Sequence, residues 1–115
     1  MANTVKQPQL FKGPKGEIHL YVLFDANVKL SCISSAFLFD LGKPQPLSRP
    51  RIVNTTEGYS LEIKNVIKLD FYLDDQMFSE EFLVVPNLTE EIIFGATTIQ
   101  NLNIKLHFEK NSATL

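Results

Sequence analysis

"SLEIKNVIKLDFYLDD", residues 60–75, carries the clearest periodic pattern of the 115-residue chain. Most of its even positions are polar, and its apolar side chains fall on odd positions: Leu61, Ile63, Ile67, Leu69, Phe71 and Leu73. Successive side chains of a β-strand point to opposite faces, so a period of two predicts a strand with one buried face. The run is long enough to be bent or to span a hairpin.

Shorter strands are predicted on both sides of this run, over residues 17–24, 28–34, 78–86, 92–94 and 103–109. "EIHLYVLF" at 17–24 alternates, but Tyr21 and Leu23 are apolar too, so its second face is expected to be mostly buried. In "NIKLHFE" at 103–109, we expect Phe108 to point inward together with Ile104 and Leu106.

The remaining segments are expected to form loops and one or two short helices. "SSAFLFDLG" at 34–42 and "ATTIQNL" at 96–102 predict short helices, and "KPQPLSRP" at 43–50 predicts a loop because it holds three prolines. Residues 1–16 predict a loose N-terminal arm or an edge segment before a single domain at 17–115. The sum is a mainly-β domain, a small closed barrel or folded sheet.

Composition narrows the classes of partner. Hydrophobic residues make up 44% and charged residues 21% of the chain, which is typical of a globular domain, and the net charge is −2. No basic cluster is interleaved with aromatic residues and no apolar stretch could span a bilayer, so neither nucleic acid nor membrane is expected. The single cysteine, Cys32, excludes a disulfide within the chain and favours a reducing, cytoplasmic location.

Most familiar catalytic motifs are missing from the sequence. It has no G-x-S-x-G, phosphate loop or H-E-x-x-H, and His19 and His107 have no ligand cluster at metal-binding spacing, so we expect no metal and no cofactor. Cys32 follows an apolar alternation and is interpreted as a small buried residue, not a nucleophile.

"LYVLFDANVKLS", residues 20–31, raises the main functional question. An apolar strand ends at Phe24 and is followed by Asp25, Ala26 and Asn27. A carboxylate at the end of a buried strand is costly unless something uses it. Asp25 could be half of a catalytic pair, the remnant of one, or an ordinary turn residue.

Three segments in order, "FDAN" at 24–27, "NTTEGYS" at 54–60 and "IIFG" at 92–95, give the chain a family resemblance. From about Glu17 to its end, the chain resembles the retropepsin-like aspartic proteases, the single-lobe relatives of pepsin. The pattern of that family is Asp-Thr/Ser-Gly near the front, a mobile flap hairpin, and an Ile/Leu-Leu-Gly turn followed by a helix and a final strand.

The resemblance implies a homodimer that acts on extended peptides. Aspartic proteases need two carboxylates that share one proton around a water, and a chain of this length supplies one, so Asp25 of each subunit would meet its partner at the two-fold axis. The flap would comprise Glu57, Gly58 and Tyr59 and would close over an extended peptide. A structural turn near the active site would comprise Ile93, Phe94 and Gly95.

The tripeptide departs from the family pattern at two positions. Ala26 lacks the hydroxyl that supports the family's active site across the dimer, and Asn27 replaces a glycine. Asn is the residue that, after Gly, best tolerates a left-handed conformation, and its side chain would lie beside the carboxylate. Two hypotheses therefore stay open: a homodimeric aspartic endopeptidase, and an inactive module of the same fold for dimerisation or peptide binding.

Overall fold

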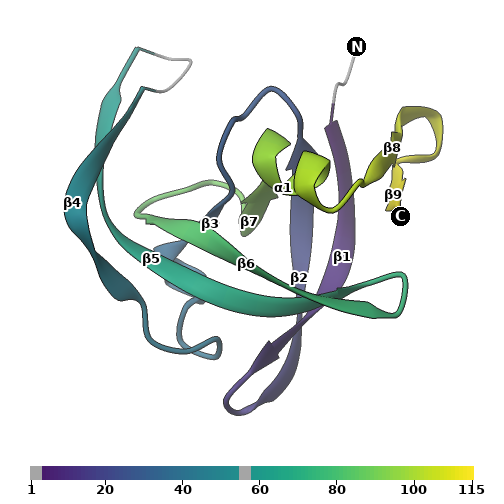
Figure 1. The fold of residues 1–115 in the computed structure, drawn as a ribbon, viewed down its shortest axis with the longest axis horizontal. Coiled ribbons are helices and arrows are strands. Elements are labelled where there is room, and N and C mark those ends of the chain that lie inside the picture. The colour runs from purple at the N-terminus through teal and green to yellow at the C-terminus, as the bar shows by residue number, and fades with distance from the viewer. Residues whose placement is uncertain (1–3, 55–57) are drawn as a thin grey trace.

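Six strands close into a small barrel in the computed structural model, which describes residues 4–54 and 58–115 (Figure 1). The ring runs β1–β2–β7–β3–β6–β5 and returns to β1 through an antiparallel pairing of β5 with β1. The strands are β1 Thr4–Gly13, β2 Gly16–Asp25, β3 Cys32–Ser34, β4 Gln45–Asn54, β5 Ser60–Leu73, β6 Gln76–Val85, β7 Ile92–Phe94, β8 Lys105–His107 and β9 Ser112–Thr114.

Helical structure is brief in the described residues. The α-helix α1 covers Ala96–Asn101, and single 3-10 turns cover η1 Ser35–Phe37 and η2 Phe108–Lys110. The predicted mainly-β barrel with little helix is confirmed. None of the described helices is long and apolar enough to cross a membrane.

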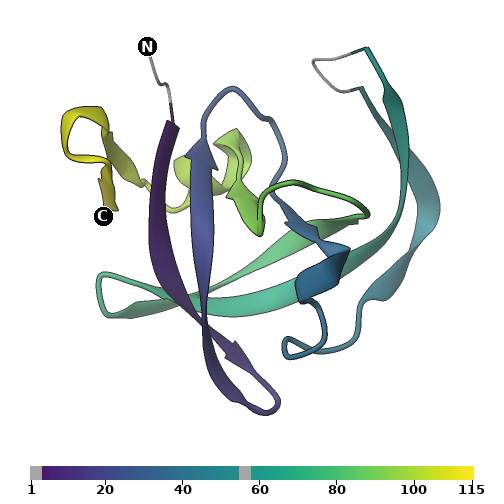
Figure 2. The same cartoon turned by 180° about the vertical axis from the view of Figure 1, so that it is seen from behind.

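The N-terminal segment is part of the barrel, so the prediction of a loose arm over residues 1–16 is wrong for β1. This strand pairs with β2 along its whole length, and the two lie side by side in Figure 2. Its side chains Val5 and Phe11 are fully buried in the core. Val5 and Phe11 are an even number of residues apart, so both point to the same face of β1 and into the barrel. The lysines and prolines around them made this spacing hard to recognise in the sequence.

Three other local predictions are also wrong. Residues 34–42 form only the 3-10 turn η1, and the loop predicted at 43–50 lies largely within the strand β4, Gln45–Asn54. Among the described strands, β4 pairs only with β5 and so lies at an edge, with an irregularity between Pro46 and Arg51. Prolines are tolerated at edges and irregularities of this kind. The last alternating segment is shorter than predicted, because β8 ends at His107 and Phe108 is 50% exposed.

Two apolar clusters explain the near-continuous hydrophobic runs of β3, β6 and β7. Alternate side chains of each strand point into the barrel or to its outer face. In β7, Ile92 and Phe94 lie in the barrel core, whereas Ile93 lies in the second cluster. The second cluster, on the outer face of these strands, contains Cys32, Ile63, Leu83, Val85 and Ile93.

Phenylalanine rings fill the barrel. Five of them are fully buried, and the ring centroids of contacting pairs among them are 4.9–6.5 Å apart: Phe11, Phe24, Phe71, Phe82 and Phe94. Tilted and edge-to-face contacts of this kind stabilise a core beyond the effect of area burial alone. The second cluster lies outside this aromatic core, where it can line a binding surface.

Candidate active site

Asp25 is the last residue of β2 and begins a tight turn. The backbone N–H of Asn27 donates to Asp25 Oδ1 at 3.0 Å, and the N–H of Val28 donates to the Asp25 carbonyl at 3.2 Å. Side-chain oxygens of aspartate commonly accept from the backbone two residues ahead, which orients the carboxylate. Asn27 is not among the described non-glycine residues with positive φ, so its backbone does not use the left-handed conformation that Asn tolerates.

The loop after Asp25 is docked onto the start of α1. The N–H of Ala96 donates to the Val28 carbonyl at 2.6 Å, and the N–H of Thr97 donates to the Lys29 carbonyl at 3.1 Å. The first N–H groups of a helix have no partner within it, so these loop carbonyls satisfy donors that would otherwise need water. The backbone of the loop is therefore fixed at two consecutive residues.

A buried pair of hydroxyls fixes the next residues. Ser31 Oγ and Thr98 Oγ1 are hydrogen-bonded, and both residues are less than 5% exposed. Ser31 Oγ also accepts the N–H of Gly95 at 2.9 Å, and the Ser31 carbonyl accepts the N–H of Leu83 at 3.0 Å. Ser31 thereby connects the loop to α1, β6 and the turn after β7.

Gly95 allows the loop to approach this closely. A Cβ atom at Gly95 would lie 2.8 Å from the carbonyl oxygens of Val28 and Leu30, both of which are backbone atoms. Contacts this short are not found for real side chains, and the backbone has little room to retreat. The parallel register of Leu23 with Ile93 and of Phe24 with Phe94 brings Gly95 to the same end of the sheet as Asp25.

An apolar groove of about 610 Å³ begins beside this turn. Residues 27–30 of the loop form one wall, and Val53 and Leu61 of the β4–β5 hairpin form part of another. The outer faces of β3, β6 and β7 supply Cys32, Leu83, Val85 and Ile93. A groove of this volume, mostly apolar with a few polar groups, is typical of a ligand-binding site.

Cys32 is part of the apolar surface of this groove. Burial raises the pKa of its thiol from 9.0 to about 11, because desolvation disfavours the thiolate. At neutral pH the side chain is a neutral, weakly polar group, in agreement with its interpretation as a small buried residue.

The hairpin β4–β5 stands apart from the barrel as a long two-stranded arm (Figure 1). Gly58, beside its tip, has a φ of +90°, and Tyr59 is 65% exposed. Glu57, the third residue proposed for a flap, lies outside the described residues.

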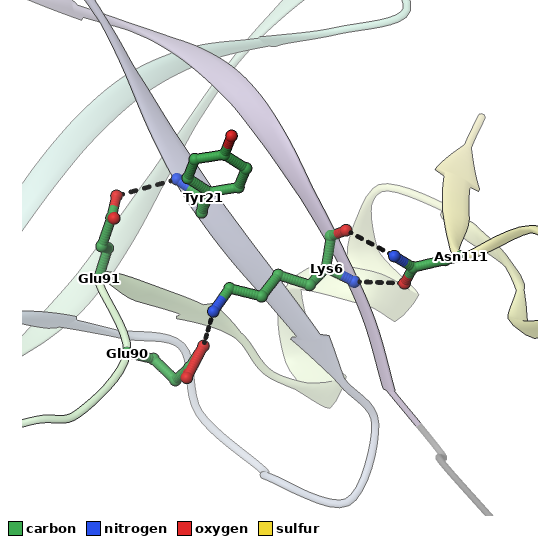
Figure 3. Close-up of polar contacts among 5 residues, drawn as sticks. All are labelled: Lys6, Tyr21, Glu90, Glu91 and Asn111. Carbon is green, nitrogen blue, oxygen red and sulfur yellow. Dashed lines mark hydrogen bonds and ion pairs between the residues drawn. The ribbon is translucent and has the colours of Figure 1, made fainter.

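Polar contacts also hold the loop before β7 against β1 and β2 (Figure 3). Lys6 Nζ lies 3.0 Å from Glu90 Oε1, a buried oxygen that accepts no other contact among the described side chains. Glu91 Oε1 accepts the backbone N–H of Tyr21 at 3.0 Å. Both acidic side chains of the loop before β7 are therefore directed toward β1 and β2.

The C-terminal hairpin β8–β9 is held against β1 by side-chain amides. Asn111 Oδ1 accepts the N–H of Lys6 at 2.9 Å, and Asn111 Nδ2 donates to the Lys6 carbonyl at 3.2 Å (Figure 3). The amide of Gln7 makes the same double contact with the backbone of Ala113. These two amides take the place of a backbone ladder between the hairpin and β1.

Several solved structures with this fold are proteases or protease-like domains. The retroviral protease-like domain of Ddi1 from Leishmania major superposes with a TM-score of 0.66 at 10% identity, covering 100% of this chain and 90% of that one. The EIAV protease, solved with an inhibitor, gives 0.61 at 16% identity, covering 89% and 92%. The chain has a retropepsin-like fold.

A third structure with the retropepsin-like fold, the protease of simian foamy virus (mac), gives a TM-score of 0.52 at 20% identity, covering 88% of this chain and 100% of that one. No model of a known protein family matches the sequence. At these identities the likeness shows the fold, and the chemistry has to be argued from the residues themselves.

The retropepsin-like fold brings together most of the residues singled out from the sequence. Asp25, Ala26 and Asn27 lie in one turn. The segment from Ile93 to Gly95 packs against β2 and against the loop that follows this turn. Sequence reasoning missed Ser31 and Thr98, whose hydroxyls fix that loop. Their one signal is that each is a small polar residue next to an apolar run, which is too common a pattern to identify them.

Proposed function

We propose that this chain is an aspartic endopeptidase that acts as a homodimer on extended peptides. The observation that carries the proposal is the position of Asp25, which ends a barrel strand, is oriented by the N–H of Asn27 and precedes the wall of an apolar groove. The retropepsin-like fold of the neighbouring structures supports the same conclusion.

The reaction needs Asp25 from two subunits. One carboxylate takes a proton from a water molecule, and the water oxygen attacks the carbonyl carbon of the peptide bond. The proton held by the second carboxyl passes to the carbonyl oxygen. The tetrahedral intermediate then collapses as the C–N bond breaks, with a proton transferred to the leaving amine.

The groove would hold a side chain of the bound peptide. Its apolar floor and the wall formed by Val53 and Leu61 would exclude water from an apolar residue next to the cleaved bond. The hairpin beyond this wall, including Gly58 and Tyr59, would then act as a flap over the peptide.

One feature favours a second candidate function, an inactive module that binds peptides or dimerises. Ala26 has no hydroxyl, so it cannot make the side-chain hydrogen bond beneath the carboxylates that the family's Thr or Ser makes. Asn27 is exposed and lines the groove, so its side chain competes for the space that a glycine would leave open.

Cleavage of a degenerate peptide library from about pH 4 to 7, where coupled carboxylate pairs share a proton, tests the activity. We expect the unsubstituted chain to cleave and Asp25→Asn to be inactive. The matched variant Asp75→Asn, in the exposed β5–β6 turn where φ is already +65°, should retain cleavage. A folded chain that cleaves nothing would exclude the peptidase.

The double substitution Ala26→Thr/Asn27→Gly separates the two candidates further. If the unsubstituted chain is inactive and the double variant cleaves peptides, then Ala26 and Asn27 account for the loss of peptidase activity. Sedimentation analysis of the unsubstituted chain tests the dimer, and a strict monomer at high concentration would contradict the shared Asp25 pair.

A further inference from the structure

We propose that Lys29 makes the groove selective for peptides that carry an acidic side chain next to their apolar residue. The inference rests on the proposed binding of peptides in the groove and adds the substrate class. Among the described residues that line the groove, Lys29 is the charged one, and the others are apolar except for Asn27 and Asn54.

The position of Lys29 is set by the backbone. Its carbonyl accepts the N–H of Thr97 and the preceding carbonyl accepts the N–H of Ala96, so the loop is held on both sides of the Cα atom. Its side chain is exposed beside the groove. A fixed backbone with a free ammonium is suited to select a charge without ordering a loop first.

No acidic side chain among the described residues forms an ion pair with Lys29. Glu90 and Glu91, which follow the groove-lining Leu88, contact Lys6 Nζ and the backbone N–H of Tyr21 instead (Figure 3). Asp25, the nearest acidic residue along the chain, accepts the N–H of Asn27. Within the described part of the chain, the positive charge of Lys29 is therefore left for a ligand.

An adjacent polar cavity of about 520 Å³ shares Leu30 and Leu83 with the groove but carries no net charge of its own. Its Arg51 and Lys68 are offset by Glu80 and Glu81. This cavity therefore adds no charge preference, and the selectivity is assigned to Lys29. In a two-fold dimer each groove would present its own Lys29, one on each side of the cleaved bond.

The test uses three labelled peptides that share a central leucine and differ only in flanking Glu, Gln or Lys residues. Their affinities are measured by fluorescence anisotropy on the Asp25→Asn protein, which prevents turnover. We expect the Glu peptide to bind about threefold to fivefold more tightly than the Gln peptide, as for a partly exposed ion pair, and the Lys peptide to bind more weakly still. Raising the salt concentration should reduce these differences.

Charge changes at Lys29 supply the decisive comparison. Added to the Asp25→Asn background, Lys29→Glu should reverse the order of the peptides and Lys29→Gln should make them nearly equal. Lys105→Glu, the same charge change at an exposed position on β8, should leave the order unchanged. Four results would each overturn the inference. The three peptides could bind equally or not at all, Lys29→Glu could leave their order unchanged, or Lys105→Glu could change the order as much as Lys29→Glu does.

Parallel cleavage assays with Asp25 intact keep this inference separate from the proposed activity. A preference for the Glu peptide without cleavage would support the role of Lys29 and exclude the peptidase. Cleavage of all three peptides with equal affinities would support the peptidase and exclude the role of Lys29.

Discussion

The two walls of the groove are built in different ways. On one side, the loop after Asp25 is held by hydrogen bonds to α1, β6 and the turn after β7, and its Ser31 is buried. On the other side, β4 pairs with no described strand except β5, and every residue of β4 is at least partly exposed. Segments with few buried contacts open at lower free energy than those fixed in a core.

Because of this difference, the orientation of the Asp25 carboxylate depends on one wall of the groove, and the access of a ligand to it depends on the other. The fixed wall can hold Asp25 in one orientation, while the hairpin can move without disturbing that orientation. Substitutions of the same kind in the two walls should therefore have unequal effects.

A methyl group added to each wall should give the largest contrast. Gly95→Ala places a Cβ atom against backbone carbonyls and should lower the free energy of unfolding by about 3 kcal/mol. Gly58→Ala, whose Cβ meets nothing within 4 Å, should cost only about 1 kcal/mol because φ is positive there. Urea denaturation measures both, and equal losses would contradict the distinction between the walls.

The alkylation rate of Cys32, which lies between the two walls, measures how accessible the floor of the groove is to solvent. At pH 9, a thiol whose pKa is raised to about 11 is ionised roughly fiftyfold less than one with a pKa of 9.0, so alkylation of Cys32 should be slower by about that factor than in the urea-unfolded chain. Stability should also fall as the pH rises from 9 toward 11, because the unfolded thiol ionises first. Equal alkylation rates would mean that the groove floor is open to solvent.

Removing one hydroxyl from each wall should give a smaller contrast. Ser31→Ala leaves the Gly95 N–H and the Thr98 hydroxyl without their partner in a buried site, at a cost of about 2 kcal/mol. Ser60→Ala removes an exposed hydrogen bond to Asn54 in the hairpin and should change stability by less than about 0.5 kcal/mol. Thermal melts of the two variants would show the difference, and a larger loss for Ser60→Ala would refute it.

Much of the barrel could be predicted because alternation is a local property. The period of two at Leu61–Leu73 and the apolar segments around Phe24 and Phe94 identified three wall strands. β4 was missed because its prolines indicate a loop unless the strand is known to lie at an edge, which depends on the whole sheet. β1 was missed because only Val5 and Phe11 mark it, six residues apart.

The candidate site was predictable only where residues adjacent in sequence form it. Asp25, Ala26 and Asn27 could be recognised together as one turn. Gly95 could be assigned a close backbone approach, but the carbonyls that it meets, at Val28 and Leu30, became known only from the fold. Lys29 gave no signal in the sequence, because its place beside the groove and the lack of an ion-pair partner among the described side chains depend on the fold.

The amide clamps of Asn111 and Gln7 also bear on how the chain behaves at high concentration. An unpaired strand edge is a template on which other chains can add and aggregate. On β1 the Asn111 amide occupies the backbone groups of Lys6, the Gln7 amide joins β1 to the backbone of β9, and on β4 the prolines Pro46 and Pro50 remove N–H donors. The two exposed strand edges of the barrel sheet are therefore both protected against fibril-like stacking.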